Sequence, residues 1–578
     1  MKNCWSALRN YRKECVLGPL FKLFEALLEL LVPLVVAAII DTGIRTKDFG
    51  YIAGMCGILI LLGAVGLAFS LTAQYFSARA AVGFSSDIRR EVFAHVMRLS
   101  FTRQDTTGTS TLITRLTGDI NQVQSGLNIF LRLFLRSPFI VFGAMIMAFT
   151  IDWRSAMVFV VIIPILFAVV FSIILSTAPL YKKVQGKLDG VMGATRENLA
   201  GARVVRAFAM EERETALFDE RNIALQKMQV FTSRISALLN PITYALINIA
   251  TLVLIWSGAV QVNIGLLEQG QVIALVSYMS QILVELIKLA NTTVTVTKAV
   301  ACLKRVQGVL DLPVDAEPAV PAQEIAGAPA VEFRNVSLMY SGAGDDSLTS
   351  ISFTARKGET IGVIGSTGSG KSSLVNLIPH FYEATGGTVR INGVDVREYP
   401  NAQLRQKIGM VPQKAVLFSG TIRSNLLWGK PDATEDEMFE ALEAAQALDF
   451  VNDLPQKLDS TVEQNGRNLS GGQRQRLTIA RALIRKPEIL ILDDSSSALD
   501  YATDARLRKA IRALSGDTTL FIVSQRTASL MHADRILVLE DGELAGQGTH
   551  RELLDSCPVY REIYESQFGD EKEGNSHA

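Results

Sequence analysis

The hydrophobic residues in the first half of the chain form long runs that carry no charge. Three runs free of Asp, Glu, Lys and Arg cover residues 49–78, 155–181 and 235–267. Each run is longer than the roughly 20 residues that a helix needs to cross about 30 Å of hydrocarbon. Three further apolar stretches contain a few charged residues and cover residues 16–40, 137–151 with an extension back to 127, and 269–301. The pattern predicts six membrane-spanning helices, with the charged stretches lining the interior of the bundle.

The basic residues predict how these helices are oriented. Lys and Arg collect in two long connections, residues 79–115 and 182–234, whereas the other connections are short and nearly balanced in charge. Because basic residues are retained on the cytoplasmic side, both termini are expected in the cytoplasm of a multi-pass protein of the cell membrane. The two long connections have helical patterns, so several spans should continue as helices beyond the bilayer.

Charged residues of the weaker stretches include Glu25, Glu29, Arg132, Arg136, Glu285 and Lys288. Charge inside a membrane is costly. We therefore expect these side chains to pair with one another, with contact to a transported substrate as the alternative.

The pattern changes after Leu312. Residues 313–330 are rich in Pro and Ala and have no apolar periodicity, which predicts a linker. From Val331 to Phe568, short apolar strands alternate with helical stretches, the pattern of an α/β domain. The final residues, 569–578, are polar and are expected to be disordered. The predicted organisation is a transmembrane domain over 1–312, the linker, and an α/β domain over 331–568.

Net charge and cysteine content narrow the possible functions. The formal net charge is zero, so there is no electrostatic reason to expect a nucleic-acid partner. The cysteines have no paired or metal-ligand spacing and are expected to be free thiols; they are Cys4, Cys15, Cys56, Cys302 and Cys557.

A glycine-rich segment identifies candidate chemistry. Residues 365–372, GSTGSGKS, fit the pattern G-x-x-x-x-G-K-[ST] and lie between an apolar strand and a helical stretch. Glycines let successive backbone N–H groups face phosphates, Lys371 adds a cation, and the Ser372 hydroxyl can hold Mg²⁺. The predicted nucleotide-binding residues are Gly365, Ser366, Thr367, Gly368, Ser369, Gly370, Lys371, Ser372 and the following Ser373, which makes this an α/β P-loop ATPase domain that binds ATP and Mg²⁺.

Further motifs follow in a fixed order: Tyr340 before the glycine-rich segment, Gln413 in MVPQ, the sequence LSGGQ at 469–473, Asp493 at the end of EILILD, and SALD at 497–500. With these motifs the chain resembles a half-transporter of the ATP-binding cassette (ABC) exporter superfamily over nearly its whole length. The resemblance implies that Tyr340 stacks on adenine and that Mg²⁺ is held by Ser372, Gln413 and Asp493.

The same resemblance implies a site shared between two chains. In this family the LSGGQ segment of one subunit caps the ATP held by the other subunit. Ser470, Gly471, Gly472 and Gln473 are intact here, so they are expected to serve a partner's site. The stretches 103–119 and 196–212 resemble the intracellular turns that dock onto the cassettes.

Two positions depart from the family pattern. Asp494 stands where the family has the Glu that orients the attacking water, and Gln525 stands where it has a His that contacts the γ-phosphate. Losing one methylene retracts the carboxylate by roughly 1.5 Å, and ~1 Å of misplacement can cost ~100-fold in rate. Because the ATP-binding motifs are retained, the chain resembles the degenerate-site subunit of heterodimeric multidrug exporters.

The expected function is therefore ATP-driven export of amphipathic compounds, drugs or lipids from the bilayer. The expected partner is a second half-transporter with the catalytic Glu and His intact. A homodimeric exporter with slow hydrolysis, a siderophore importer of the same fold, and an ATP-gated channel or sensor remain the alternatives.

Overall fold

The computed structural model describes residues 4–314, 318, 320–495, 500–514 and 518–568. The contacts within the chain divide it into two compact units. The first unit contains Met1–Met97 and Thr109–Pro313, and the second contains Arg98–Gly108 and Val314–Ala578. A short helix, α4 (Phe101–Thr107), therefore groups with the second unit although it lies between two helices of the first.

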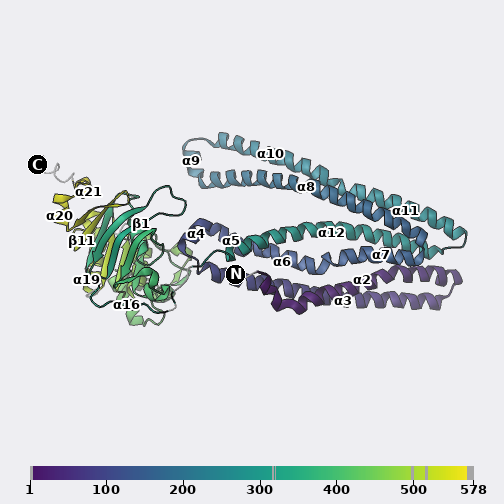
Figure 1. Cartoon of the computed structure of the whole chain (residues 1–578), viewed down its shortest axis with the longest axis horizontal. Helices are drawn as coiled ribbons and strands as arrows, with labels where there is room; N and C mark the ends of the chain where they lie inside the picture. Colours follow the sequence, from purple (N-terminus) through teal and green to yellow (C-terminus); the bar gives the residue numbers. More distant parts are fainter. Residues whose placement is uncertain (1–3, 315–317, 319, 496–499, 515–517, 569–578) are drawn as a thin grey trace. The chain divides into compact units, whose positions relative to one another are not determined.

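The first unit is a bundle of long helices (Figure 1). Its principal helices are α2 (Arg12–Ala38), α3 (Phe49–Val96), α6 (Ile120–Ile129), α7 (Arg136–Ile151), α8 (Trp153–Ala200), α10 (Glu211–Ala237), α11 (Leu239–Asn263) and α12 (Gln269–Leu310). Shorter helices are α1 (Cys4–Ala7), α5 (Thr109–Thr114) and α9 (Ala202–Ala207), with 3-10 or π turns at Leu8–Tyr11, Ile39–Ile44, Arg115–Asp119 and Phe130–Phe134.

Six stretches of this unit are long and apolar enough to cross a membrane, as the sequence pattern predicts. They are Leu8–Ile44, Phe49–Val96, Thr109–Ile151, Trp153–Ala200, Glu211–Asn263 and Gln269–Leu310. Helices α3 and α8 contain 48 residues each, which at ~1.5 Å per residue gives about 72 Å. Both are much longer than the ~30 Å hydrocarbon layer, so each continues well outside it.

Local capping explains where these helices begin. Asp48 precedes α3 and accepts a hydrogen bond from the backbone N–H of Tyr51, while Asp152 precedes α8 and accepts one from Ser155. Such side chains satisfy backbone donors that have no partner within the helix. Each of these short turns therefore ends one span and starts the next.

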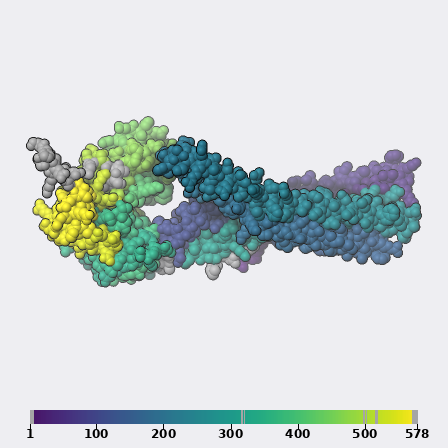
Figure 2. Space-filling model, turned by 90° about the horizontal axis from the view of Figure 1, so that it is seen from above, coloured from purple at the N-terminus to yellow at the C-terminus, as the bar shows by residue number. Residues whose placement is uncertain are grey.

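The interior of the bundle is formed mainly by α2, α7, α8, α11 and α12. Phe159 of α8 and Tyr278 of α12 are fully buried there. The Tyr278 hydroxyl donates a 2.6 Å hydrogen bond to the carbonyl oxygen of Leu30, in α2. Helices α8, α9 and α10 form a projecting arm in which α10 runs beside α8 (Figures 1 and 2).

The second unit contains two main β-sheets. The larger has six strands in the order β12-β11-β3-β10-β9-β6, and the smaller has the order β2-β1-β4-β5. The strands are β1 (Val331–Leu338), β2 (Leu348–Ala355), β3 (Thr360–Gly365), β4 (Gly386–Ile391), β5 (Val394–Asp395), β6 (Ile408–Val411), β9 (Ile489–Asp493), β10 (Thr519–Val523), β11 (Arg535–Glu540) and β12 (Glu543–Gly548), with β7 (Gly420–Thr421) and β8 (Thr461–Val462) forming a separate pair.

Strands β3, β10, β9 and β6 are mutually parallel neighbours in the larger sheet. Strands β3, β9 and β10 are buried along their whole length, as expected of parallel strands covered on both faces. Alternate side chains enter two cores: Ile364, Leu490 and Ile522 face one, while Val363, Ile491 and Phe521 face the other. These four short apolar strands of the predicted α/β pattern thus lie side by side.

The helices of this unit surround the sheets. They are α13 (Lys371–Leu377), α14 (Asn401–Gln406), α15 (Ile422–Leu426), α16 (Glu435–Ala444), α17 (Leu448–Asn452), α18 (Gly471–Leu483), α19 (Tyr501–Leu514), α20 (His550–Ser556) and α21 (Pro558–Phe568), with 3-10 turns at Val396–Glu398, Lys457–Asp459, Gln464–Gly466 and Thr527–Ser529. The tail predicted to be disordered, 569–578, lies outside the described residues.

Candidate nucleotide site

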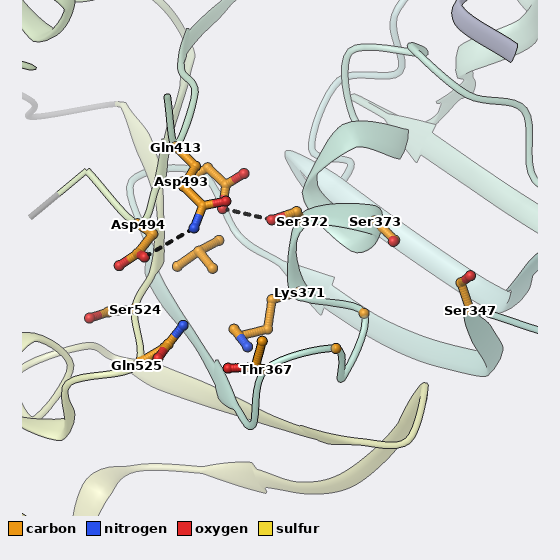
Figure 3. A pocket seen from close by; sticks show the side chains of 13 residues that line it. Ser347, Thr367, Lys371, Ser372, Ser373, Gln413, Asp493, Asp494, Ser524 and Gln525 are labelled. Atoms are coloured by element: carbon orange, nitrogen blue, oxygen red, sulfur yellow. Dashed lines mark hydrogen bonds between the residues drawn. The ribbon is translucent and has the colours of Figure 1, made fainter. Parts of the chain in front are cut away.

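The carboxyl ends of four parallel strands enclose a cavity of about 230 Å³. Crevices at this edge of α/β sheets are where ligands bind. The walls come from the segments that follow β3, β6, β9 and β10 (Figure 3). The lining residues are Ser347, Thr367, Gly368, Gly370, Lys371, Ser372, Ser373, Gln413, Asp493, Asp494, Val523, Ser524 and Gln525.

Lys371 begins α13 and is buried inside the glycine-rich loop. Its Nζ donates hydrogen bonds to the carbonyl oxygens of Gly365, at 2.9 Å, and Ser366, at 2.6 Å. Burial lowers the pKa of Lys371, and the nearby carboxylates of Asp494 and Asp493 oppose that shift. The loop therefore holds a partly desolvated cation at the cavity, where an anion would be attracted to it.

Gly370 shows why this loop needs glycine. It has φ of 92°, and a Cβ there would lie 2.6 Å from the carbonyl oxygen of Ser347. Only glycine adopts such a conformation without strain, and the close approach excludes any side chain. Gly368 also has positive φ, of 89°, but a Cβ there meets no atom within 4 Å.

Asp493 and Ser372 form a candidate metal-ligand pair. The Ser372 hydroxyl donates a 3.1 Å hydrogen bond to Oδ1 of Asp493, which ends β9 (Figure 3). Burial raises the pKa of Asp493; the Ser372 hydrogen bond lowers it, Asp494 adds to the rise, and Lys371 opposes it. A metal cation beside the Asp493 carboxylate would act together with Lys371 and offset the free-energy cost of burying the charged carboxylate.

Asp494 follows directly and lies in a left-handed conformation, with φ of 44°. Its backbone N–H donates a 3.0 Å hydrogen bond to the carbonyl oxygen of Val523, which ties the end of β9 to β10. Its Oδ2 accepts a hydrogen bond from Nε2 of Gln413 at 3.4 Å. The carboxylate thus faces the cavity and is held toward the loop after β6 (Figure 3).

Gln525 follows β10 and its side chain points into the cavity on the side of Asp494 (Figure 3). The backbone carbonyl oxygen of Gln525 accepts a 2.8 Å hydrogen bond from Nε2 of Gln567, in α21. Helix α21 therefore fixes the backbone at Gln525. The side chain supplies an amide, which hydrogen-bonds but does not titrate.

Tyr340 does not line the cavity among the described residues. Its hydroxyl donates a 3.0 Å hydrogen bond to Oγ of Ser373, next to the predicted metal-binding serine. Its ring meets the ring of Tyr382 edge-on, with centroids 5.0 Å apart. Ser366 and Ser369 belong to the glycine-rich loop but are also absent from the lining.

The LSGGQ residues lie apart from this cavity. Ser470 caps the start of α18: its Oγ accepts from the backbone N–H of Gln473, whose Oε1 accepts from the N–H of Ser470. Gly471 is open, since a Cβ there meets nothing within 4 Å. Within the described part of the chain, residues 470–473 do not line the cavity that holds Lys371. The neighbouring residues 497–499 of SALD lie outside the described residues.

Some lining residues have little or no signal in the sequence. Ser347 comes from the turn between β1 and β2, where nothing distinguishes it from its polar neighbours. Ser524 could have been found, because it follows β10 immediately and the carboxyl ends of parallel strands meet at one edge.

Five of the six charged residues singled out in the membrane stretches form ion pairs within the bundle. Arg136 donates to Glu285 at 2.8 Å and also pairs with Glu29, while Lys288 and the Ser137 hydroxyl donate to Glu285. Glu25 pairs with Lys22, a residue that the sequence pattern did not single out, and Arg132 donates to the neutral side chain of Gln74.

The cysteines Cys15, Cys56, Cys302 and Cys557 are free thiols. The Cys4 side chain lies outside what the structure describes.

Two family models match the chain. The model described as ABC transporter transmembrane region matches residues 15–286, and the model described as ABC transporter matches residues 348–497. The second match includes Lys371, Gln413 and Asp493 and ends within the segment after β9.

Relatives match over most of their own length. An "Uncharacterized ABC transporter ATP-binding protein" of Mycobacterium tuberculosis is 37% identical over 97% of both chains. A "Putative multidrug export ATP-binding/permease protein" of Bacillus subtilis is 32% identical over 98% of this chain and 99% of the relative. An "ATP-dependent lipid A-core flippase" of Syntrophus aciditrophicus is 31% identical over 85% of this chain and 81% of the relative.

A solved structure has the same fold. It is a bacterial Atm1-family ABC exporter with ATP bound, which superimposes with a TM-score of 0.81 at 24% identity, over 97% of this chain and 98% of the other.

Proposed function

We propose that this chain, which belongs to the ABC transporter family and has the organisation of an exporter-type half-transporter, is the weakly hydrolysing half of a heterodimer. The chain is an ATP-dependent translocase and a multi-pass membrane protein. The observation that carries the proposal is the presence of Asp494 and Gln525 at the two catalytic positions of a cavity whose other binding residues follow the family pattern.

The cavity is suited to holding ATP. The backbone N–H groups of the glycine-rich loop and the Lys371 ammonium would bind the phosphates. Ser372, Asp493 and Gln413 would hold Mg²⁺, which neutralises phosphate charge when it is bound. The oxygen atoms of Ser372 and Asp493 already lie 3.1 Å apart, and hard oxygen donors of this kind fit a small divalent cation. In the described residues, no group of three or more His, Cys, Asp or Glu side chains forms a separate metal site.

Hydrolysis at this cavity would be slow. A general base is typically worth ~100- to 10,000-fold in rate. The Asp494 carboxylate is one methylene shorter than the family's Glu and already accepts a hydrogen bond from Gln413. Gln525 can donate to a phosphate oxygen, but it has no imidazole. Binding would therefore persist while water attack is poorly positioned.

The intact LSGGQ segment would act on the partner's ATP. Ser470 begins a helix of 13 residues, α18, whose N-terminus is suited to binding an anion. Gly471 is exposed and unobstructed, so a phosphate held by another chain could approach it. Turnover at that second site would return the cassettes to the open state.

The projecting arm supports pairing with another subunit. Leu199, Val204 and Phe208, at the turn that contains α9, are 74%, 60% and 70% exposed. Large apolar side chains gathered on a helical turn in the aqueous phase indicate an interaction surface. We assign this surface to the partner's cassette, and the cassettes to the cytoplasm, because the basic residues collect in the connections that contain α4 and α9.

The proposed substrates are amphipathic compounds or lipids taken from the bilayer. The names of two relatives refer to multidrug export and to a lipid A-core flippase. Most intramembrane charges of this chain pair within the bundle, so their charge is largely compensated there and an amphipathic substrate fits better than a strongly charged one.

Purification from native membranes through a tag on this chain tests the proposal. The proposal predicts that a second half-transporter, with Glu and His at the two positions, co-purifies in equal amount and that the chain expressed alone has little ATPase activity. Robust ATPase from the chain expressed alone would contradict it and favour a homodimer.

A further inference from the structure

Within the second unit, an aromatic cluster attaches helix α4 to the nucleotide-binding fold. Phe101 lies with its ring centroid 4.7 Å from that of Phe381, and the Arg405 guanidinium lies 5.3 Å from the Phe381 centroid. These contacts are apolar and cation-π in character, and they hold one end of α4 on the segment that follows α13.

The next residue, Tyr382, makes a contact of a different kind. Its hydroxyl donates a 2.7 Å hydrogen bond to Oδ2 of Asp105, in α4. Hydrogen bonds to a carboxylate are shorter and stronger than those between neutral groups. Burial, above all, raises the pKa of Tyr382, and the hydrogen bond to Asp105 adds to this, so the phenol remains a proton donor at neutral pH.

Tyr382 also contacts the residue assigned to adenine. Its ring meets that of Tyr340 at an interplanar angle of 87°, with centroids 5.0 Å apart. The Tyr340 hydroxyl in turn donates to Oγ of Ser373, which lies in α13 and lines the nucleotide cavity. Asp105, Tyr382, Tyr340 and Ser373 therefore form a continuous series of contacts from α4 to the phosphate-binding helix.

We propose that Tyr382 is a positioning residue that links ATP occupancy of this chain's own cavity to the placement of α4. The proposal rests on the proposed function in one respect, namely that adenine stacks on Tyr340. A base stacked on Tyr340 fixes a ring whose edge contact with Tyr382 then orients the Tyr382 hydroxyl. That hydroxyl holds Asp105, so α4 responds to ATP that this site binds but hydrolyses slowly.

The chain offers a matched control. Tyr11 also donates from its hydroxyl to an aspartate, Asp87, at 3.1 Å, and both residues belong to the first unit. Tyr11→Phe therefore removes the same chemical group as Tyr382→Phe without touching the nucleotide-binding unit. Asp105 is exposed, so Asp105→Ala removes the acceptor without opening a cavity.

The test measures amide hydrogen exchange of residues 98–108 in the tagged, native complex, with and without Mg-ATP. Labelling of this chain by 8-azido-ATP is measured in parallel. We expect Mg-ATP to slow exchange in wild type and Tyr11→Phe by about tenfold, the scale of one charge-assisted hydrogen bond. Tyr382→Phe, Asp105→Ala and the double variant should all lose this protection to the same extent, while labelling stays within about twofold of wild type, because none of these changes touches the phosphate loop.

Three results would overturn the proposal. If Mg-ATP still slows amide exchange of residues 98–108 in Tyr382→Phe, the Tyr382 hydroxyl does not couple ATP binding to α4. Loss of 8-azido-ATP labelling in Tyr382→Phe would make Tyr382 part of the binding pocket. Protection that survives in Lys371→Ala would mean that α4 responds to the partner's site. Absence of labelling in wild type would instead contradict the proposed ATP site itself, so the two failures are distinguishable.

Discussion

Gln413 donates a hydrogen bond from Nε2 to Oδ2 of Asp494 over 3.4 Å, joining the segments that follow β6 and β9 at the nucleotide cavity. In the proposed reaction, the amide is a candidate Mg²⁺ ligand and the carboxylate is the residue closest in type to a catalytic base. In that reaction, their contact would hold the short carboxylate near the metal ligand and away from the attacking water. The relationship gives a physical reason to expect binding without efficient turnover.

Binding and chemistry should separate by mutation. Lys371→Ala should weaken ATP binding at this chain's site, because it removes the side-chain cation that the phosphate loop places at the cavity. Asp494→Asn should leave binding within about twofold, since the carboxylate is not among the groups assigned to the phosphates. Photolabelling with 8-azido-ATP over a range of concentrations measures both. An equal loss of ATP labelling in Lys371→Ala and Asp494→Asn would contradict the assignment of binding and chemistry to different residues.

The two glycines of positive φ should differ in their tolerance of alanine. Alanine at either position adopts a left-handed conformation, which costs about 1–2 kcal/mol. Gly370→Ala also places Cβ 2.6 Å from the Ser347 carbonyl oxygen, whereas Gly368→Ala meets nothing within 4 Å. Gly370→Ala should therefore lower the thermal unfolding midpoint further and reduce ATP labelling more strongly. Identical midpoints would show that the loop moves to accept the methyl group.

The place of this cavity in the fold could be predicted from the sequence where it depends on local pattern. The parallel strands β3, β6, β9 and β10 could be read from alternating apolar and helical segments, and parallel strands bring their carboxyl ends to one edge. That geometry is enough to place Lys371, Gln413 and Asp493 around one cavity. The six membrane spans were predictable because bilayer thickness fixes their minimum length.

Contacts between distant residues were not predictable in this way. The Tyr382 hydroxyl reaches Asp105 across 277 positions of sequence, and Arg136 reaches Glu285 across 149. No periodicity in either segment specifies the other, because the partner is selected by packing of whole helices and not by local propensity. The hydrogen bond between Gln413 and Asp494 likewise depends on how two loops leave their strands.

The signature segment should affect the activity of the whole complex. Ser470→Ala or Gly471→Asp should reduce total ATPase by about 100-fold, the effect of removing one preorganised donor from a site of developing negative charge. Labelling of this chain by 8-azido-ATP should be unchanged, because neither residue lines its own cavity. Gly471→Asp should not disturb folding, since a Cβ at this position meets nothing within 4 Å. Undiminished phosphate release would refute the shared site.

The buried ion pair in the membrane bundle should matter more than its exposed neighbour. Arg136 has a side chain that is 8% exposed and contacts both Glu285 and Glu29, whereas Lys288 is 44% exposed. Breaking a buried pair leaves an uncompensated charge and costs about 3–5 kcal/mol, while an exposed pair contributes about 0–1 kcal/mol. Arg136→Gln should thus lower the unfolding midpoint in detergent by several times as much as Lys288→Gln. Equal shifts of the unfolding midpoint in the two variants would indicate that water reaches the ion pair between Arg136 and Glu285.

Restoring the family residues should increase hydrolysis most when both are present. Asp494→Glu extends the carboxylate but leaves an amide at position 525, so we expect a limited gain in phosphate release. The double variant Asp494→Glu, Gln525→His supplies base and imidazole together and should give the larger gain, because groups that act as a unit are not additive. A single variant that matches the double variant would contradict a role for Gln525 in the low rate.

Steady-state phosphate release from the native complex carrying Asp494→Asn tests the central claim most directly. If this chain's cavity binds ATP but contributes little turnover, the variant should keep most of the wild-type ATPase, whereas amidation of the co-purifying partner's catalytic Glu should remove nearly all of it. Loss of more than about nine-tenths of the activity in Asp494→Asn, equivalent to roughly 1.4 kcal/mol of barrier, would contradict the account and indicate two equally productive sites.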